Sequence, residues 1–260
     1  MSVRGMDALA GLSQALFIVG AFVLFVSWTQ KDQFPQPSAA LPDLSREPVQ
    51  VPVEEPVFKA QAGGVTYDIQ PLYDYELWGL IVSTHRSDAW FDLYHEDWKD
   101  YLNSVDLCVM WGSNVASGVY RHMKFHNGSF TAYARFRRGV PPSLVADFRP
   151  DQISNNHLLP GDAFVEDAIR RVGPGDQIRL RGWLVQYSHS NGRYQRGTSV
   201  TRTDQGAHAC ETVYVTDFEI LSAPNTAWRI AFHLSVALTV AAGLTGLALW
   251  FLRPALAAKH

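Results

Sequence analysis

The sequence predicts an α+β membrane protein: a β-rich, partly closed barrel with one or two inserted helices, flanked by two transmembrane α-helices. Two long apolar runs lie near the ends of the 260-residue chain, and short β-branched and aromatic runs separated by turn signals lie between them. The hydrophobic fraction of 47% lies in the ordinary globular range. The membrane prediction therefore depends on where the apolar residues lie.

The first apolar run, Ala8 to Trp28, contains no charged residue. At a rise of 1.5 Å per residue it spans about 30 Å, the thickness of a hydrocarbon core. A cleavable signal peptide is the alternative, but the run exceeds the roughly 7–15 apolar residues of such peptides. The nearest small-residue cleavage pattern, Ser38-Ala39-Ala40, also lies far downstream. We interpret residues 1–29 as an uncleaved transmembrane helix.

The second run, Ile230 to Leu252, has Trp228 and Trp250 near its ends, as an interfacial aromatic belt would. It predicts a transmembrane helix over residues 228–253, followed by a short tail, 254–260. Ala242 and Gly246 form a small-xxx-small pair that lets another helix approach closely.

The charges beside the two spans predict an orientation. The tails carry Arg4, Arg253 and Lys259, whereas the loop side carries Lys31 and Arg229. This bias favours cytoplasmic termini and a periplasmic domain in a bacterial inner membrane.

The chain has two cysteines, Cys108 and Cys210, and both fall in the soluble domain. An even count in an exported domain predicts one disulfide, which would contribute about 4–5 kcal/mol by closing a long loop. Two unrelated buried thiols are the alternative.

Residues 30–62 are rich in proline and acidic residues. Proline at this density is excluded from helix interiors and central strands, so the segment is interpreted as a semi-extended tether. The prolines are Pro35, Pro37, Pro42, Pro48, Pro52 and Pro56. The β-rich domain is then predicted over residues 63–223.

Within the domain, the sequence predicts strands, two helices and a hairpin turn at Ser190-Asn191-Gly192. The helices are Trp90–Tyr101 and Asp162–Val172, the latter with Asp162 as its N-cap. The expected strands are Val65–Ile69, Tyr75–Ser83, Val105–Trp111, Ser129–Phe136, Gln177–Tyr187, Thr198–Thr203 and Glu211–Leu221. The step from a GPGD turn at 173–176 to a strand ending in a glycine is similar to part of an OB-type barrel. Another α+β arrangement is the alternative.

Three segments carry a resemblance: ISNNHLLPGD (Ile153–Asp162), GDQIRLRGWLV (Gly175–Val185) and SVTRTDQGAHACETVYV (Ser199–Val215). They resemble a group of uncharacterised proteobacterial inner-membrane proteins with an Asn-His-Leu stretch and an Arg-x-Asp-x-Gly…Ala-Cys-Glu stretch. The resemblance covers a little under half of the soluble domain. It implies two transmembrane helices around a periplasmic OB-like domain and implies no reaction.

Asn155, Asn156 and His157 are predicted to lie on a loop before a helix, where they could bind an anion or orient a general base. Arg202 and Asp204 are expected to join them in a ligand-binding loop. The alternative is that the Asn side chains stabilise turns and His157 is structurally hydrogen-bonded.

A catalytic triad of Ser199, His157 and Asp204 is a second hypothesis, although no G-x-S-x-G elbow supports it. The alternative to this triad is a strand followed by a turn, in which Arg202 pairs with Asp204. A cysteine beside His157 is a variant of the hydrolase hypothesis, but Cys108 lies in a buried-type strand where a thiol would be inert.

His122 and His126 are candidate metal ligands, with His208 or His189 as a third. Exposed histidines are the simpler interpretation, because no H-E-x-x-H pattern or cysteine pair lies nearby. No cofactor motif is present. The net charge of −3 without a basic stripe argues against a nucleic-acid partner.

These observations favour a non-enzymatic accessory, binding or scaffolding protein of a membrane assembly. Its expected partners are the lipid bilayer and either other membrane proteins or a second copy of the chain. An envelope hydrolase using His157 and a metal-binding module are the alternative functions.

Overall fold

The computed structural model describes residues 3–87, 93–128, 131–189, 193–204 and 209–257. The chain divides into two compact units, each described by itself. One contains the residues up to Gln33 and from Pro224 onward, and the other contains Phe34–Ala223.

The first unit is a pair of helices, α1 (Val3–Gln30) and α6 (Thr226–Ala257), both long and apolar enough to cross a membrane. They pack through small residues. Ser13 Oγ donates a hydrogen bond to the Ala242 carbonyl oxygen at 2.7 Å, and a β-carbon at Gly246 would lie 3.1 Å from Ser13 Oγ. The close approach expected at Ala242 and Gly246 is therefore made by the first helix of the same chain.

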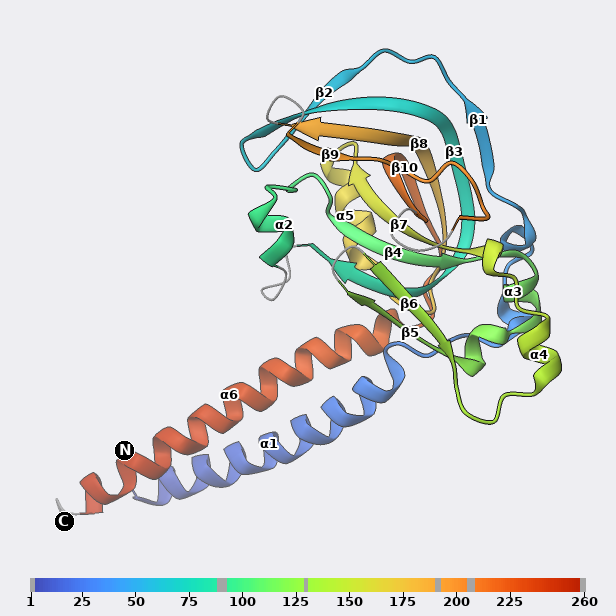
Figure 1. The fold of residues 1–260 in the computed structure, drawn as a ribbon. Coiled ribbons are helices and arrows are strands. Elements are labelled where there is room, and N and C mark those ends of the chain that lie inside the picture. The colour runs from blue at the N-terminus through green and yellow to red at the C-terminus, as the bar shows by residue number, and fades with distance from the viewer. Residues whose placement is uncertain (1–2, 88–92, 129–130, 190–192, 205–208, 258–260) are drawn as a thin grey trace. The chain divides into compact units, whose positions relative to one another are not determined.

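The second unit is built around a closed ring of five strands (Figure 1). In ring order, each strand pairs with the next and the last with the first: β3 (Val65–Arg86), β4 (Val105–Met110), β7 (Ile153–Pro160), β10 (Cys210–Ser222) and β8 (Gln177–His189). The β7–β10 pair is parallel and the other four pairs are antiparallel. Every strand of the ring therefore has a hydrogen-bonded neighbour on both sides.

The inside of the ring is the main apolar core, to which all five strands contribute. Helix α5 (Ala163–Arg171) adds Val165 and Ile169 to this core. The Asp162 side chain accepts a hydrogen bond from the Val165 amide at 2.8 Å, which confirms the predicted helix and its N-cap.

Strand β3 is continuous, although the sequence predicts two strands separated by Pro71. The register between β3 and β8 shifts between Pro71 and Tyr73, so the strand bends at the proline without breaking. In Figure 1, β3 curves around the domain. β3 pairs with β8 on both sides of this bend, from Asp68 to Leu80, and with β4 from Leu80 to Arg86.

The Pro-rich segment is not the predicted tether. Pro37 and Pro42 begin short 3₁₀ helices, Pro37–Ala39 and Pro42–Ser45, and Leu44 between the later prolines is 1% exposed. Strands β1 (Val49–Pro52) and β2 (Phe58–Ala62) then pair with β3. The prolines are tolerated because they lie at helix starts and on edge strands. The soluble unit therefore begins at Phe34 instead of residue 63.

The connection from β4 to β7 contains helix α3 (Gly112–Ser117), a short 3₁₀ turn and a two-stranded hairpin of β5 (Met123–Gly128) and β6 (Thr131–Phe136). Helix α4 (Pro142–Ala146) and a second 3₁₀ turn, Pro150–Gln152, complete it. Of the predicted helix at 90–101, residues 90–92 lie outside the described part, Leu93–Asp97 form α2, and residues 98–101 are not helical. The expected turn at 190–192 is also outside, between β8 and β9 (Tyr194–Arg196). Residues 198–203 are irregular instead of forming the expected strand.

Gly182 is required where β8 lies close to its antiparallel neighbour β10. A β-carbon at this position would lie 1.9 Å from the Tyr214 carbonyl oxygen, whereas one at Gly197 would meet nothing within 4 Å. We expect Gly182→Ala to lower the free energy of unfolding by about 3 kcal/mol or more, because a backbone atom must move. We expect Gly197→Ala to change it by less than about 0.5 kcal/mol. Urea unfolding of the purified full chain, followed by tryptophan fluorescence, measures both. Equal stability of the two variants would contradict this packing.

Candidate functional site

A row of polar side chains lies on the outer wall of β4, β7 and β10. Residues that are direct cross-strand partners project to the same face of a sheet. Asp106 is opposite His157, and Cys108 is opposite Asn155, across the antiparallel β4–β7 pair. Cys210 is in turn the partner of Asn155 across the parallel β7–β10 pair. These five residues therefore share one face, opposite to the face that forms the barrel core.

Asp106 and His157 form a buried hydrogen-bonded pair. His157 Nδ1 lies 2.7 Å from Asp106 Oδ1, and the two side chains are 5% and 1% exposed. Asn103 supports the pair by donating from Nδ2 to Asp106 Oδ1 at 2.9 Å. The same Asn103 nitrogen lies 3.1 Å from His95 Nε2. The loop from β3 to β4 thus folds back over the wall and supplies His95 and Asn103 to this network, while the strands supply Asp106 and His157.

The pair is charged at neutral pH. Burial alone would lower the pKa of His157, but the charge of Asp106 and its hydrogen bond outweigh burial and raise the pKa to about 9. For Asp106, burial raises the pKa, but the charge and hydrogen bonds of His157 and Asn103 lower it below the usual value overall. The imidazole therefore holds its proton at neutral pH and is a poor general base.

A second buried acid, Asp100, ties the same loop to strands β8 and β9. The hydroxyls of Tyr187 and Tyr194 donate to its two oxygens at 2.7 and 2.9 Å, and Arg196 Nη1 lies 3.9 Å away. Asp100 is 1% exposed. These bonds hold the β3–β4 loop against β8 and β9, together with the contact of His189 Nε2 with the Trp98 carbonyl oxygen at 3.0 Å.

The predicted disulfide between Cys108 and Cys210 is wrong: no bond joins the two residues. Both are partners of Asn155, one on each side, so their strands are separated by β7. Two strand spacings place their α-carbons about 10 Å apart, beyond the roughly 7 Å that a disulfide spans. Burial raises the pKa of the Cys108 thiol to about 12, which makes it inert, whereas Cys210 is partly exposed.

Asn155, Asn156 and His157 do not lie on a loop, as the sequence predicts, but on the central strand β7. Alternation sends Asn156 to the opposite face from its two neighbours. Its Nδ2 donates to Ser154 Oγ at 3.0 Å and to the Leu107 carbonyl oxygen at 3.2 Å. Asn155 Nδ2 lies 3.6 Å from Cys210 Sγ, and its Oδ1 accepts from Asn127 of β5 at 3.0 Å.

The predicted triad of Ser199, His157 and Asp204 is not assembled. Ser199 Oγ lies 2.7 Å from Asp204 Oδ2 and 2.8 Å from the Thr201 carbonyl oxygen. The Ser199 amide bonds to the Cys210 carbonyl oxygen, on the side of β10 away from β7. His157 is instead held by Asp106. The strand β10 therefore separates the proposed nucleophile from the proposed base.

Arg202 is paired with Glu211, not with Asp204 or with the Asn155–His157 stretch. Arg202 Nη1 donates to Glu211 Oε1 at 2.6 Å, and its guanidinium lies over the rings of Tyr75 and Trp111. Burial raises the pKa of Glu211 to about 7 despite the opposing charge of Arg202. Arg202 and Asp204 therefore do not join His157 in one ligand-binding loop.

The metal candidates His122 and His126 lie at the start of the β5–β6 hairpin and on its first strand. The His126 ring stacks on Tyr133, with ring centroids 4.7 Å apart. Among the described residues, no three His, Cys, Asp or Glu side chains form a group that could hold a metal ion. His189 lies against Tyr67 and Tyr194, and His208 falls outside the described residues.

Sequence reasoning missed Asp106, Asn103 and His95. Asp106 gives the clearest signal: it is a carboxylate within an otherwise apolar run, Val105 to Trp111. A buried charge of this kind requires a partner. The partner, His157, lies 51 positions away in sequence and is identified by the strand register.

Comparisons of this chain with protein-family models, curated proteins and solved structures found no match.

We expect His157→Ala to lower the free energy of unfolding by about 3–5 kcal/mol at neutral pH, because it leaves the buried Asp106 carboxylate without its partner. His122→Ala is the matched control and should cost less than about 1 kcal/mol, because His122 is exposed. Urea unfolding of the full chain gives both values. An equal effect of the two substitutions would show that the pair contributes little.

The pair also predicts a pH dependence. A pKa of His157 raised above its unfolded value of 6.5 contributes stability fully below pH 6.5 and loses it as pH rises through about 9. The lowered pKa of Asp106 contributes stability above its usual value of 3.8, which is lost as pH falls below it. His157→Gln should lack the alkaline decrease, and this comparison isolates the pair from Glu211. An unchanged alkaline decrease in His157→Gln would contradict the assignment.

Proposed function

We propose that this chain is a membrane-anchored accessory protein, a binding or scaffolding module of a bacterial inner-membrane assembly. The supporting observation is the attachment of one barrel between two apolar helices through short connections. Three residues separate Gln30 of α1 from Phe34 of the barrel unit, and Ala223 to Asn225 precede α6. A domain held at both ends in this way keeps a restricted position at the membrane surface, which suits presentation to a neighbouring subunit.

The barrel is proposed to be OB-like. The ring order β3-β4-β7-β10-β8, the parallel β7–β10 pair and helix α5 between β7 and β8 are the features that support it. OB folds bind ligands on the wall formed by their second and third strands, between two flanking loops. In this chain the corresponding wall, β4 and β7, carries the buried Asp106–His157 pair and Cys108. A fold-level analogy does not by itself assign a ligand.

The polar wall favours a structural role over acid–base catalysis. His157 holds its proton, Cys108 is inert, and Ser199 is directed to Asp204. One arrangement supports the alternative of a thiol-dependent envelope hydrolase: Cys210 is partly exposed and hydrogen-bonds the His157 ring, which Asp106 in turn orients. A Cys–His–Asp sequence of contacts is the feature that such chemistry needs.

The periplasmic orientation of the domain is also a proposal. Without the disulfide, it rests on the greater number of Lys and Arg residues in the tails, Arg4, Arg253 and Lys259, than beside the domain. The likeness to uncharacterised proteobacterial inner-membrane proteins agrees with this orientation and likewise stays a prediction.

The accessory function predicts that other subunits co-purify with this chain in a fixed stoichiometry. The tagged full chain, expressed at its native level and extracted in mild detergent, should migrate on a native gel as a complex containing other membrane subunits or a second copy. The His157→Ala variant, whose barrel is weakened but whose helices are intact, should lose those companions. A solitary wild-type protein would contradict the proposal. If its Cys210 also reacted rapidly with iodoacetamide, and more slowly in His157→Gln, the hydrolase would be favoured.

The orientation is tested at Phe164 on α5, which is 88% exposed. In a Cys210→Ser background, Phe164→Cys should react with a membrane-impermeant maleimide in intact cells whose outer membrane has been opened. The Cys210→Ser protein without the new cysteine is the control, because the remaining Cys108 is 3% exposed. Labelling of Phe164→Cys only after cell lysis would place the domain in the cytoplasm.

A further inference from the structure

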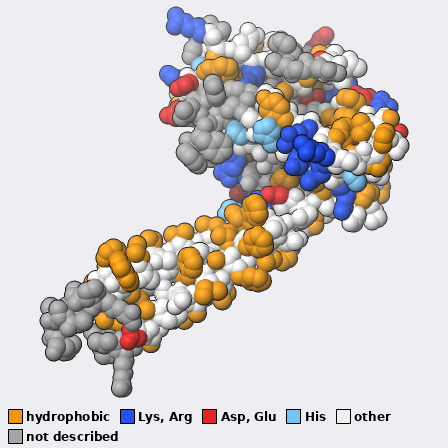
Figure 2. Space-filling view, turned by 60° about the horizontal axis from the view of Figure 1, so that its bottom comes forward, with side chains coloured by type: hydrophobic (Ala, Val, Ile, Leu, Met, Phe, Trp, Pro, Cys, Tyr) orange, Lys and Arg blue, Asp and Glu red, His pale blue; other side chains and the backbone are white. Residues whose placement is uncertain are grey.

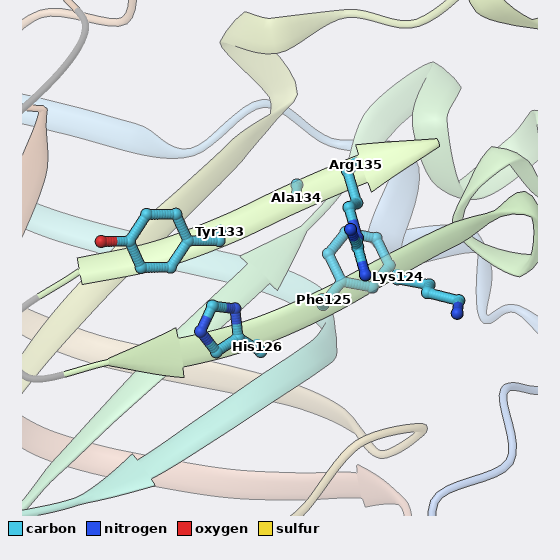
Figure 3. A pocket seen from close by; sticks show the side chains of 6 residues that line it. All are labelled: Lys124, Phe125, His126, Tyr133, Ala134 and Arg135. Atoms are coloured by element: carbon cyan, nitrogen blue, oxygen red, sulfur yellow. The ribbon is translucent and has the colours of Figure 1, made fainter. Parts of the chain in front are cut away.

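The β5–β6 hairpin presents a cationic face. Lys124 of β5 is directly opposite Arg135 of β6, and His126 is opposite Tyr133. Figure 3 shows these four side chains along the hairpin, with the His126 and Tyr133 rings side by side. They line an open cavity of about 600 Å³ together with Phe125 and Ala134. Figure 2 shows Lys and Arg side chains gathered beside histidines on one face of the domain.

The charge around this hairpin is one-sided. No Asp or Glu occurs between Leu107 and Ala146, although the whole chain has more acidic than basic residues. The same segment contains five cationic residues, Arg121, Lys124, Arg135, Arg137 and Arg138. Within the described part of the chain, none of the five forms an ion pair with a carboxylate. Arg121 and Arg137 donate to backbone carbonyl oxygens, and Lys124, Arg135 and Arg138 are exposed.

The opposition of Lys124 and Arg135 costs stability. Like charges directly opposite each other destabilise an antiparallel pair, and a two-stranded sheet has little stability to spare. The arrangement becomes favourable when an anion lies between the two cations, because each then gains an opposite charge. The hairpin therefore has the chemistry of a phosphate-binding surface.

The hairpin contacts the segment of the barrel unit that follows α1 in the chain. The hydroxyl of Tyr120 and Nη1 of Arg121 both donate to the Pro35 carbonyl oxygen, at 3.1 and 3.2 Å, and the Phe125 ring meets Phe34 with centroids 5.8 Å apart. Pro35 is five residues after Gln30, the last residue of α1, so the chain between them spans at most about 18 Å. Leu221, which packs in the same apolar cluster, is five residues before the start of α6.

We propose that the solvent face of the β5–β6 hairpin binds the headgroups of anionic phospholipids in the bilayer that holds α1 and α6. Lys124 and Arg135 contact the headgroup phosphates, and the exposed Tyr133, at 54%, lies at the membrane–water interface that tyrosine favours. The inference uses the membrane anchoring of the proposed function but requires none of its protein partners.

The test uses the full chain in nanodiscs of phosphatidylcholine, with or without a minority of phosphatidylglycerol. Hydrogen–deuterium exchange of peptides covering residues 121–138 should be slower with phosphatidylglycerol, by at least about fivefold, and high salt should remove the difference. Equal exchange in both nanodiscs would overturn the proposal. Slower exchange in phosphatidylcholine nanodiscs on adding inorganic phosphate alone, to the same extent, would assign the site to free anions and also overturn it.

The variant Lys124→Glu/Arg135→Glu keeps the like-charge opposition but reverses its sign, and should lose the lipid-dependent protection. Lys124→Gln/Arg135→Gln should also lose it while stabilising the hairpin, so unfolding cannot explain the loss. Lys59→Glu/Arg171→Glu changes the net charge as much as the first variant at two exposed cations elsewhere and should retain the protection. Retention of the effect in both hairpin variants would contradict the role of Lys124 and Arg135.

Discussion

The barrel unit depends on one strand, β3, that is long enough to pair with both β8 and β4. β3 pairs with β8 over most of its length and with β4 through its last residues, and this double pairing closes the five-stranded ring. The bend at Pro71 and the close approach of β8 and β10 at Gly182 provide the curvature that closure needs. β1 and β2 then add to the free part of the β3 edge, which otherwise would expose unpaired backbone groups. Closure thus orders both the apolar core inside and the polar row outside.

The polar row shows how a buried charge is accommodated in a central strand. Asp106 and His157 each would be costly alone in a wall that is almost fully buried, and their register opposite each other removes that cost. Asn103 and Asp100 then hold the loop that covers them, through hydrogen bonds to Asp106 and to Tyr187 and Tyr194. The same protonated His157 that stabilises the wall is unsuited to accept a proton at neutral pH.

Local patterns predicted the features that depend on neighbouring residues, and failed where distant residues decide. The two apolar helices, the α5 helix with its Asp162 cap, and the strands at 105–110 and 210–222 follow from runs, caps and alternation. The prediction of a disulfide was wrong because the number of cysteines does not reveal that strand β7 lies between Cys108 and Cys210. The tether failed because proline density outweighed Leu44, whose burial depends on residues far along the chain. Asp106 and His157 could be paired only once the register of β4 and β7 was known.

The contact between Ser13 and Ala242 joins residues 229 positions apart, so it sets an order of assembly. A ribosome must synthesise the whole barrel before α6 exists, and until then α1 has no helix to pack against. The more apolar of the two helices is α1, the one that is made first. α6 is made last, when α1 and all the strands of the barrel have already been synthesised. The α1–α6 contact can therefore form only in chains in which all the residues between the two helices have been synthesised.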